Sequence, residues 1–216
     1  MATSQLTLYQ GALRLLGQTD LEDLDEAREP RYILDDIWDE NTRNFVLEQG
    51  LWNFAMRSAM IEDDTSITPD FGFRYAFAKP SDWVRTGIVC SDEYFRTPLT
   101  QMDFRDENGY WWSDIDTLYV QYVSNDSSYG NSLSLWPQTF VKYVEAYLAE
   151  QAAPRLFQTE EKIGVIRKLT LRRLLDARAK DGLNEGAGIF PSGSWAAARR
   201  GGWGRRDRGS RSRLTG

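Results

Sequence analysis

Apolar residues near the start of the chain recur at steps of three and four residues, which places them on one face of an α-helix. They are Leu6, Tyr9, Leu13 and Leu16. Thr3 or Ser4 stands where a helix N-cap is needed, and Gly17 stands where a left-handed C-terminal residue is favoured. The pattern therefore predicts a first helix that ends before Gly17.

A second helical stripe follows an acidic connector at residues 18–29. Pro30 suits the first turn of a helix, where the N–H group that proline lacks would have no intrahelical partner. The positions of the stripe are Ile33, Leu34, Ile37, Trp38, Thr42, Phe45 and Val46. They predict one continuous helix from about Glu29 to Gly50, onto which Trp52 and Phe54 fold back.

From about Ser58 the helical spacing stops, and short β-prone runs separated by Pro, Gly, Asp and Asn begin. The predicted strands are residues 59–62, 71–78, 84–91, 110–112 and 117–123. Asn108-Gly109, between charged and aromatic residues, predicts a tight hairpin turn. No helical pattern interrupts this block, so an antiparallel sheet is expected. Residues 125–134 are rich in Ser, Asn and Gly and predict a loop.

Helical spacing then returns in two segments. The first is predicted to extend from Pro137, in a first-turn position, to near Pro154. The second is predicted from about Glu160 to Lys180, with Gly182 as its stop.

The predicted order is helix–helix, strands, helix–helix and a C-terminal tail, so the fold class is α+β. Each helix pair alone would bury little apolar surface, and the two pairs are therefore expected to form one four-helix-type bundle with an inserted antiparallel β module. The predicted bundle domain comprises residues 1–57 and 136–182, and the β-rich inserted module comprises residues 58–135. An extended arm containing Arg, Gly and Trp comprises residues 183–216.

Charge is divided unequally along the chain. Residues 185–216 carry seven arginines against Glu185 and Asp207, a net charge of +5, whereas the whole chain carries a formal −6. Residues 1–184 therefore carry −11, which suits either a surface that repels nucleic-acid phosphates or a solvated exterior. The tail has too few aliphatic side chains to fold alone. It could be an arm that orders on a neighbouring subunit or larger partner, a nucleic-acid-binding segment, or a solubilising disordered end.

Histidine is absent from the chain, and Cys90 is the one cysteine. These counts exclude a Ser-His-Asp triad, a Cys-His dyad, an internal disulfide and a His/Cys zinc site. No cofactor motif is present. Cys90 lies in a strand-like run, and a buried inert thiol is expected. Carboxylate pairs are the remaining catalytic material, such as Asp35 and Asp39, four residues apart on the second predicted helix.

The N-terminus shows no signal peptide, and no apolar run approaches the roughly 18 residues that span a bilayer. A soluble cytosolic product is expected.

Several segments have a recognisable sequence. Residues 2–13 are ATSQLTLYQGAL, residues 47–55 are LEQGLWNFA and residues 77–83 are FAKPSDW. Together with residues 28–31, 34–39, 191–195 and 207–213, they resemble the tail tubular protein A family of short-tailed, podovirus-type bacteriophages. The resemblance covers both ends and the first half of the chain and is weak over residues 90–135. It implies a non-enzymatic head-to-tail adaptor, in which a ring of twelve copies joins the portal protein to the tail nozzle protein and encloses the DNA-ejection channel.

The resemblance also implies roles for particular residues. The arm would bind the portal or a neighbouring subunit through Trp195, Arg199, Arg200, Trp203, Arg205, Arg206, Arg208, Arg211 and Arg213. The β module would face the nozzle through Tyr75, Trp83, Tyr110, Trp111 and Trp112. The protein would lie in the virion, at the head–tail junction, with DNA passing without sequence-specific binding and with no membrane contact.

Two alternatives come from other function classes. One is a nucleic-acid-binding protein that uses its Arg-rich tail on phosphates. The other is an adaptor with an added carboxylate-dependent activity on cell-wall glycans, an activity credited to some relatives in this family. No catalytic pair of that family can be transferred to this sequence residue by residue, so no catalytic residue, metal ligand or cofactor is assigned.

Overall fold

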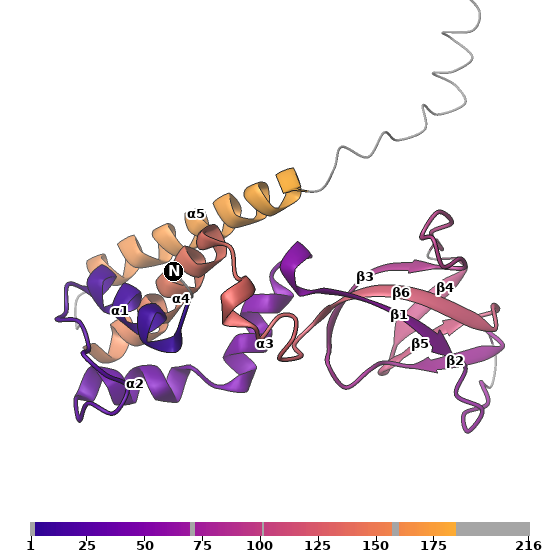
Figure 1. The fold of residues 1–216 in the computed structure, drawn as a ribbon, viewed down its shortest axis with the longest axis horizontal. Helices are drawn as coiled ribbons and strands as arrows, with labels where there is room; N and C mark the ends of the chain where they lie inside the picture. Colours follow the sequence, from indigo (N-terminus) through magenta and orange to yellow (C-terminus); the bar gives the residue numbers. More distant parts are fainter. Residues whose placement is uncertain (1–2, 70–71, 101, 157–159, 185–216) are drawn as a thin grey trace, which may run out of the picture. The chain divides into compact units, whose positions relative to one another are not determined.

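The computed structural model describes residues 3–69, 72–100, 102–156 and 160–184 (Figure 1). The chain divides into two units, residues 1–182 and 183–216, and nearly all of the described residues belong to the first. Five α-helices and two antiparallel three-stranded sheets occur among the described residues, which confirms the predicted α+β class.

The elements follow one another as helices, strands and helices. The α-helices are α1 (Gln5–Leu16), α2 (Glu29–Ile37), α3 (Glu40–Glu48), α4 (Gln138–Leu156) and α5 (Glu160–Asn184). The strands are β1 (Met56–Glu62), β2 (Tyr75–Ala78), β3 (Trp83–Cys90), β4 (Phe104–Glu107), β5 (Tyr110–Ser113) and β6 (Thr117–Ser124). Two 3-10 turns, η1 (Asn53–Ala55) and η2 (Leu133–Leu135), stand at the passages between helices and strands.

Helix α1 begins and ends as its sequence predicts. The Ser4 hydroxyl accepts a hydrogen bond from the Thr7 N–H at 3.3 Å, which supplies one of the partners that a helix N-terminus lacks. Gly17 adopts φ +69°, a left-handed conformation that glycine reaches without steric cost. The predicted inward face, including Tyr9 and Leu13, is fully buried.

The predicted continuous helix from Glu29 to Gly50 is wrong, because the chain breaks between α2 and α3. Trp38 ends α2 with ψ +56°, outside the helical range. The Asp39 carboxylate then accepts the Thr42 N–H at 2.7 Å and caps α3. This hydrogen bond outweighs the slight burial of the carboxyl group and lowers the pKa of Asp39. An aspartate at this position stabilises a new helix start more than it stabilises a helix interior.

The two C-terminal helices extend past their predicted ends. Helix α4 continues through Pro154 to Leu156, since a proline in the last turn removes only one backbone hydrogen bond. Helix α5 continues through Gly182 to Asn184. Glycine weakens a helix by about 1 kcal/mol relative to alanine but does not by itself end one.

The helices share one hydrophobic core. Helix α4 contacts α1 and α2, and α5 reaches α4 through the Thr170 hydroxyl, which donates to the Ala146 carbonyl at 3.1 Å. Phe140 lies at the centre of an aromatic cluster, with its ring centroid 4.8 Å from that of Trp52 and 4.8 Å from that of Trp136. The rings come from the residue before η1, from the residue after η2 and from α4, and they therefore join segments that lie more than 80 residues apart.

The strands form two sheets, where the sequence predicts one. The first sheet has the order β1-β6-β3 and the second has the order β2-β5-β4, all antiparallel. Strand β4 was not predicted. The Asn108-Gly109 hairpin is confirmed, because Glu107 pairs with Tyr110 across two residues of positive φ. A second, smaller core lies between the sheets and is formed by Phe77, Val89, Trp111, Leu118, Val120 and Tyr122.

Candidate functional site

The candidate site is an open groove of about 890 Å³ on the second sheet. It is bounded by the segment between β1 and β2, the segment before β4, and the strands β4 and β5 themselves. Its apolar lining consists of Ile67, Pro69, Phe73, Met102 and Trp112. Its charged lining consists of Arg105, Glu107 and Asp114. A lining that combines large apolar side chains with a few charged ones is typical of a protein-binding surface.

Short-range contacts hold the charged and aromatic side chains of the groove. The Trp112 indole N–H donates to the Glu107 carbonyl at 3.2 Å, and the Tyr110 ring lies 5.8 Å from the Trp112 ring. The Asp114 carboxylate accepts the Arg74 N–H at 3.1 Å, which ties the segment before β2 to the end of β5. Trp112 is thereby fixed before any partner binds, which lowers the entropy cost of binding.

The five aromatic residues predicted to face the nozzle lie in three different environments. Trp112 lines the groove, and Tyr110 packs beside it. Tyr75 and Trp83 are half-buried and pack against the core between the sheets. Trp111 is fully buried in that core and offers no exposed surface in the described part of the chain. Of the five, Trp112 is the residue that lines the groove as described, and Tyr110 contacts it.

Trp111 and Trp83 belong to a polar network that joins the two sheets. The Lys79 ammonium lies 2.5 Å from an Asp106 carboxylate oxygen and 3.5 Å from the centre of the Trp83 ring. The other Asp106 oxygen accepts hydrogen bonds from the Thr86 hydroxyl at 2.7 Å and the Trp111 indole at 3.2 Å. Salt bridge, cation–π contact and hydrogen bonds thus meet at one point, where they fix the second sheet against β3.

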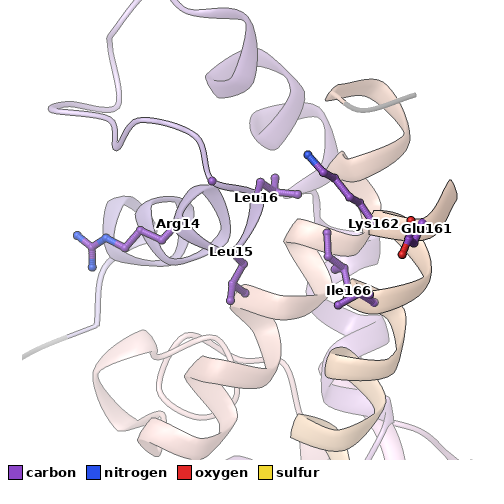
Figure 2. A pocket seen from close by; sticks show the side chains of 8 residues that line it. Arg14, Leu15, Leu16, Glu161, Lys162 and Ile166 are labelled. Carbon is purple, nitrogen blue, oxygen red and sulfur yellow. The ribbon is translucent and has the colours of Figure 1, made fainter. Parts of the chain in front are cut away.

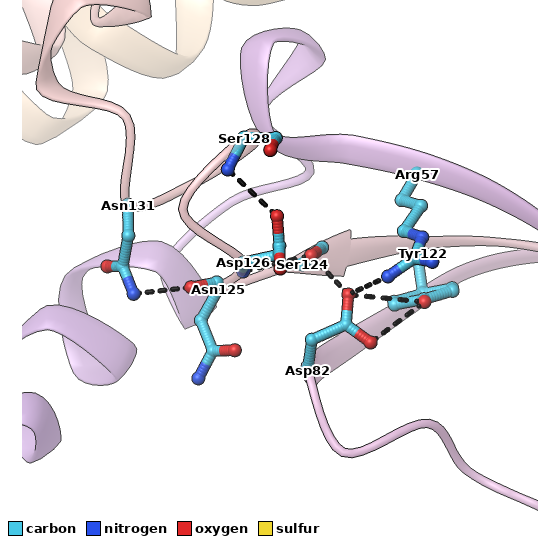
Figure 3. A network of polar contacts seen from close by, with 8 residues as sticks. All are labelled: Arg57, Asp82, Tyr122, Ser124, Asn125, Asp126, Ser128 and Asn131. Atoms are coloured by element: carbon cyan, nitrogen blue, oxygen red, sulfur yellow. Dashed lines mark hydrogen bonds and ion pairs between the residues drawn. The ribbon is translucent and has the colours of Figure 1, made fainter.

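A second network lies where the strands meet the helical part (Figure 3). The Asp82 carboxylate accepts hydrogen bonds from Arg57 at 2.7 Å, from the Tyr122 hydroxyl at 3.1 Å and from the Ser124 hydroxyl at 2.5 Å. Burial alone would raise the pKa of Asp82, but these three donors outweigh it and lower that pKa. Burial, with the Asp82 charge, raises the pKa of Tyr122 to about 12.

The two carboxylates considered for catalysis, Asp35 and Asp39, and two further ones on the β module, Asp64 and Asp103, all have structural partners. Asp35 accepts the Tyr9 hydroxyl at 2.9 Å, and Asp39 caps α3, so the helix break separates a pair expected on one helix face. The Asp64 carboxylate accepts from Ser66, and that of Asp103 accepts from Thr100. The hydrogen bonds that Asp64 and Asp103 accept outweigh their slight burial and lower the pKa of both carboxyl groups. A general acid needs a raised pKa instead.

A smaller cleft of about 530 Å³ lies between the C-terminal end of α1 and the first turns of α5 (Figure 2). Leu15, Leu16 and Ile166 line it. The Arg14 side chain turns away to pair with Asp20 at 2.6 Å. The cleft lies between two helices and has a mixed lining, in which Glu161 and Lys162 stand beside the apolar side chains.

The described residues contain no group of three His, Cys, Asp or Glu side chains placed to hold a metal ion. Cys90 is buried, and burial with the nearby Asp92 charge raises its pKa, as an inert thiol requires. None of the helices in the described ranges combines the length and the apolar character needed to cross a bilayer. Every residue assigned to the arm, from Trp195 to Arg213, lies outside the described residues.

No protein-family model matches the chain, and comparison with curated proteins finds no similar protein.

Most residues of the groove, and the basic charge of α5, were not predicted from the sequence. Phe73, Met102 and Ile67 come from segments without regular spacing, so no periodic signal marks them. The charge of α5 was available from the sequence: Glu160–Asn184 contains seven Lys or Arg against four Asp or Glu. The basic part of the chain therefore begins at α5, before the tail.

Proposed function

We propose that this protein is a structural, non-enzymatic head-to-tail adaptor of a short-tailed phage virion. Twelve copies form a ring between the portal and the tail nozzle, and the ring encloses the channel through which DNA passes. The helices form the body of the ring as a four-helix-type bundle, the β module points to the nozzle, and the arm binds the portal or the adjacent subunit. The resemblance of the helix entries and of residues 77–83 to that family supports this proposal.

The groove on the second sheet is the observation that carries the proposal. It is open, and both apolar and charged side chains line it. Met102 projects from it with 90% of its surface exposed. An exposed methionine beside a fixed tryptophan is typical of a surface that a protein partner covers. A nozzle subunit is the partner to which the resemblance assigns this end of the chain.

Replacing an apolar residue of the groove with a charged one tests whether the groove binds the nozzle protein. Met102→Glu should weaken binding to the cognate nozzle protein by at least about 10-fold, because a carboxylate would be desolvated in the contact. Met60→Glu is the matched control, since Met60 is 58% exposed on β1 and lies outside the groove. Binding of both variants to portal should equal that of the unmodified protein. If both variants bind the nozzle protein equally well, the groove is not part of the interface.

The arm has its own test. Deleting residues 183–216 should leave a folded protein that no longer attaches stably to portal rings, because the arm supplies the Trp anchors and the Arg donors. Circular dichroism checks folding, and co-sedimentation with portal checks attachment. Normal attachment by the truncated protein would show that another surface holds the portal.

A nucleic-acid-binding function is the second candidate, favoured by the basic charge of α5 and of the tail that follows it. Guanidinium contacts to phosphate release counterions, so such binding would weaken steeply with salt. A salt titration of the full chain on duplex and single-stranded DNA separates the two functions. Tight, steeply salt-dependent binding would favour this candidate, whereas the adaptor should bind DNA weakly.

A further inference from the structure

The outward side of α5 carries large apolar side chains that no other described residue covers. Leu171 and Leu175 are 58% and 63% exposed, and Val165, 63% exposed, lies at the edge of this side, beside the cleft with α1. Ile166, Thr170 and Ala177 are buried on the opposite side of the same helix. Lys168 and Arg172 fall among the exposed apolar positions at helical spacing. The outer α5 face is defined here as Val165, Lys168, Leu171, Arg172 and Leu175.

The cations of this face differ from those on the inner side of α5. Arg167 pairs with Glu150 at 3.2 Å, and Arg173 donates to the Lys142 carbonyl at 2.8 Å, so both hold α5 to α4. Lys168 and Arg172 make no hydrogen bond or ion pair with any described residue. They therefore place two positive charges beside three exposed aliphatic side chains.

A face of opposite charge lies on the connector and α2. Residues 18–37 contain eight acidic side chains against Arg28 and Arg31. Glu29 and Asp36 are exposed, and Tyr32 between them is 55% exposed. Steps of three and four residues place these three on one side of α2. They are called the acidic α2 face, with Glu22, Asp23 and Asp25 as its exposed neighbours.

The two faces lie on opposite sides of α4. Helix α5 reaches α4 at Lys142 and Ala146, through hydrogen bonds to their carbonyls. Helix α2 reaches α4 at Arg155, which pairs with Asp36 at 2.6 Å, and α3 reaches it at Tyr147, whose ring stacks on Phe45. At 100° per residue, positions 147 and 155 point away from positions 142 and 146. Figure 1 draws α5 and α2 on opposite sides of α1 and α4.

We propose that the outer α5 face of one copy docks on the acidic α2 face of a second copy. Complementary patches on opposite sides of one subunit give a head-to-tail contact, which generates a ring when the rotation between copies closes. The inference supplies the lateral contact of the proposed adaptor, and its closure into a ring rests on that proposed function.

Charge and apolarity together select this occupant. Two α5 faces would meet with like charges, and the tail, at +5, is repelled by the basic α5. Nucleic-acid phosphates could pair with Lys168 and Arg172, but they would leave the exposed aliphatic side chains in contact with phosphate and water. Glu29 and its exposed neighbours Glu22, Asp23 and Asp25 supply carboxylates for the two cations, and Tyr32 supplies a ring for the leucines.

Paired charge reversals test the contact in the full chain. Lys168→Glu with Arg172→Glu reverses one face, and Glu29→Lys with Asp25→Lys reverses the other; all four side chains are exposed and make no ion pair with a described residue, so folding should be unaffected. Each double variant should self-associate at least about 10-fold more weakly than the unmodified chain by sedimentation equilibrium. An equimolar mixture of the two double variants should recover association, because each reversed face then meets a reversed partner. Arg74→Glu with Arg96→Glu, exposed on the β module, is the matched control and should change nothing.

The outcomes separate this inference from the proposed function. The same variants are also loaded on portal rings, and the number of copies per ring is counted. Full rings from all variants would overturn the α5–α2 contact and leave the adaptor function standing. If the mixture recovers self-association but no variant or unmodified chain binds portal, the α5–α2 contact is supported and the adaptor function is overturned. Three other results would overturn the contact. One is that the unmodified chain fails to self-associate both alone and on portal, and another is that its self-association requires residues 185–216. The third is that the α5 reversal abolishes binding to duplex DNA and changes nothing else.

Discussion

The helical part and the β module are stabilised by different kinds of contact. The helices share a large apolar core, in which α4 is surrounded and Phe140 contacts aromatic rings on several sides. The β module has a small core between its sheets, and charged networks at Asp106 and Asp82 hold its strands together. The helical part should therefore respond most to lost volume, and the β module most to lost charge.

Two half-buried carboxylates show this difference directly. Asp82, in the β module, receives three hydrogen bonds that lower its pKa below the usual range despite burial. Glu145, on α4, is desolvated by burial, and Arg173, with its guanidinium 3.7 Å away, only partly offsets this, so its pKa is raised. The charge on Asp82 stabilises the fold, whereas the charge on Glu145 costs stability.

The largest effect is expected in the helical core. Phe140→Ala should lower the free energy of unfolding by about 3–5 kcal/mol, because it removes a fully buried ring and leaves a cavity among Trp52, Phe54 and Trp136. Denaturant unfolding followed by tryptophan fluorescence measures this. A loss below about 1 kcal/mol would show that the aromatic cluster does not carry the helical core.

A smaller effect is expected at Asp82. Asp82→Asn should cost about 1.5–3 kcal/mol at pH 7, since it weakens hydrogen bonds to a charged group and leaves Arg57 unpaired. The folded pKa is below the unfolded value of about 3.9, so this stability is present above pH 4 and is lost as pH falls further. The difference between wild type and variant should therefore shrink below pH 4. Asp116→Asn, on the exposed surface of the same module, should change stability by less than about 0.5 kcal/mol.

The smallest effect, of opposite sign, is expected at Glu145. Its folded pKa is above the unfolded value of about 4.3, so the folded state loses stability as pH rises through that range. Glu145→Gln should make the protein equally or slightly more stable at pH 7, by less than about 1 kcal/mol, with the gain disappearing below pH 4. Thermal unfolding over a pH series checks this. A clear loss at pH 7 would mean that the Arg173 ion pair outweighs desolvation, and the comparison with Asp82 would fail.

The elements that sequence could predict are those whose ends are fixed locally. Ser4 and Gly17 cap α1 through contacts within a few residues, and Asn108-Gly109 turns a hairpin by its own backbone preference. The break before Asp39 was missed although aspartate is a strong N-cap, because the apolar stripe continues across it. Strand β4, with the sequence FRDE, was missed because it is an exposed edge strand with three charged residues.

The candidate site was harder to predict because distant segments form it. Period-two alternation in Tyr110–Ser113 separates Trp111 from Trp112 onto opposite faces of the sheet. The sequence does not say which face is inward, and the packing of Phe77 and Val120 decides that Trp111 is buried. Met102 and Phe73 meet Trp112 only because two irregular segments flank the second sheet.

The central claim is that copies of this chain assemble as a ring on a portal. Mass measurement of the purified full chain mixed with cognate portal rings tests it most directly. We expect a discrete complex in which each portal ring gains the mass of twelve chains. A portal mass that stays unchanged at saturating protein concentration would contradict it.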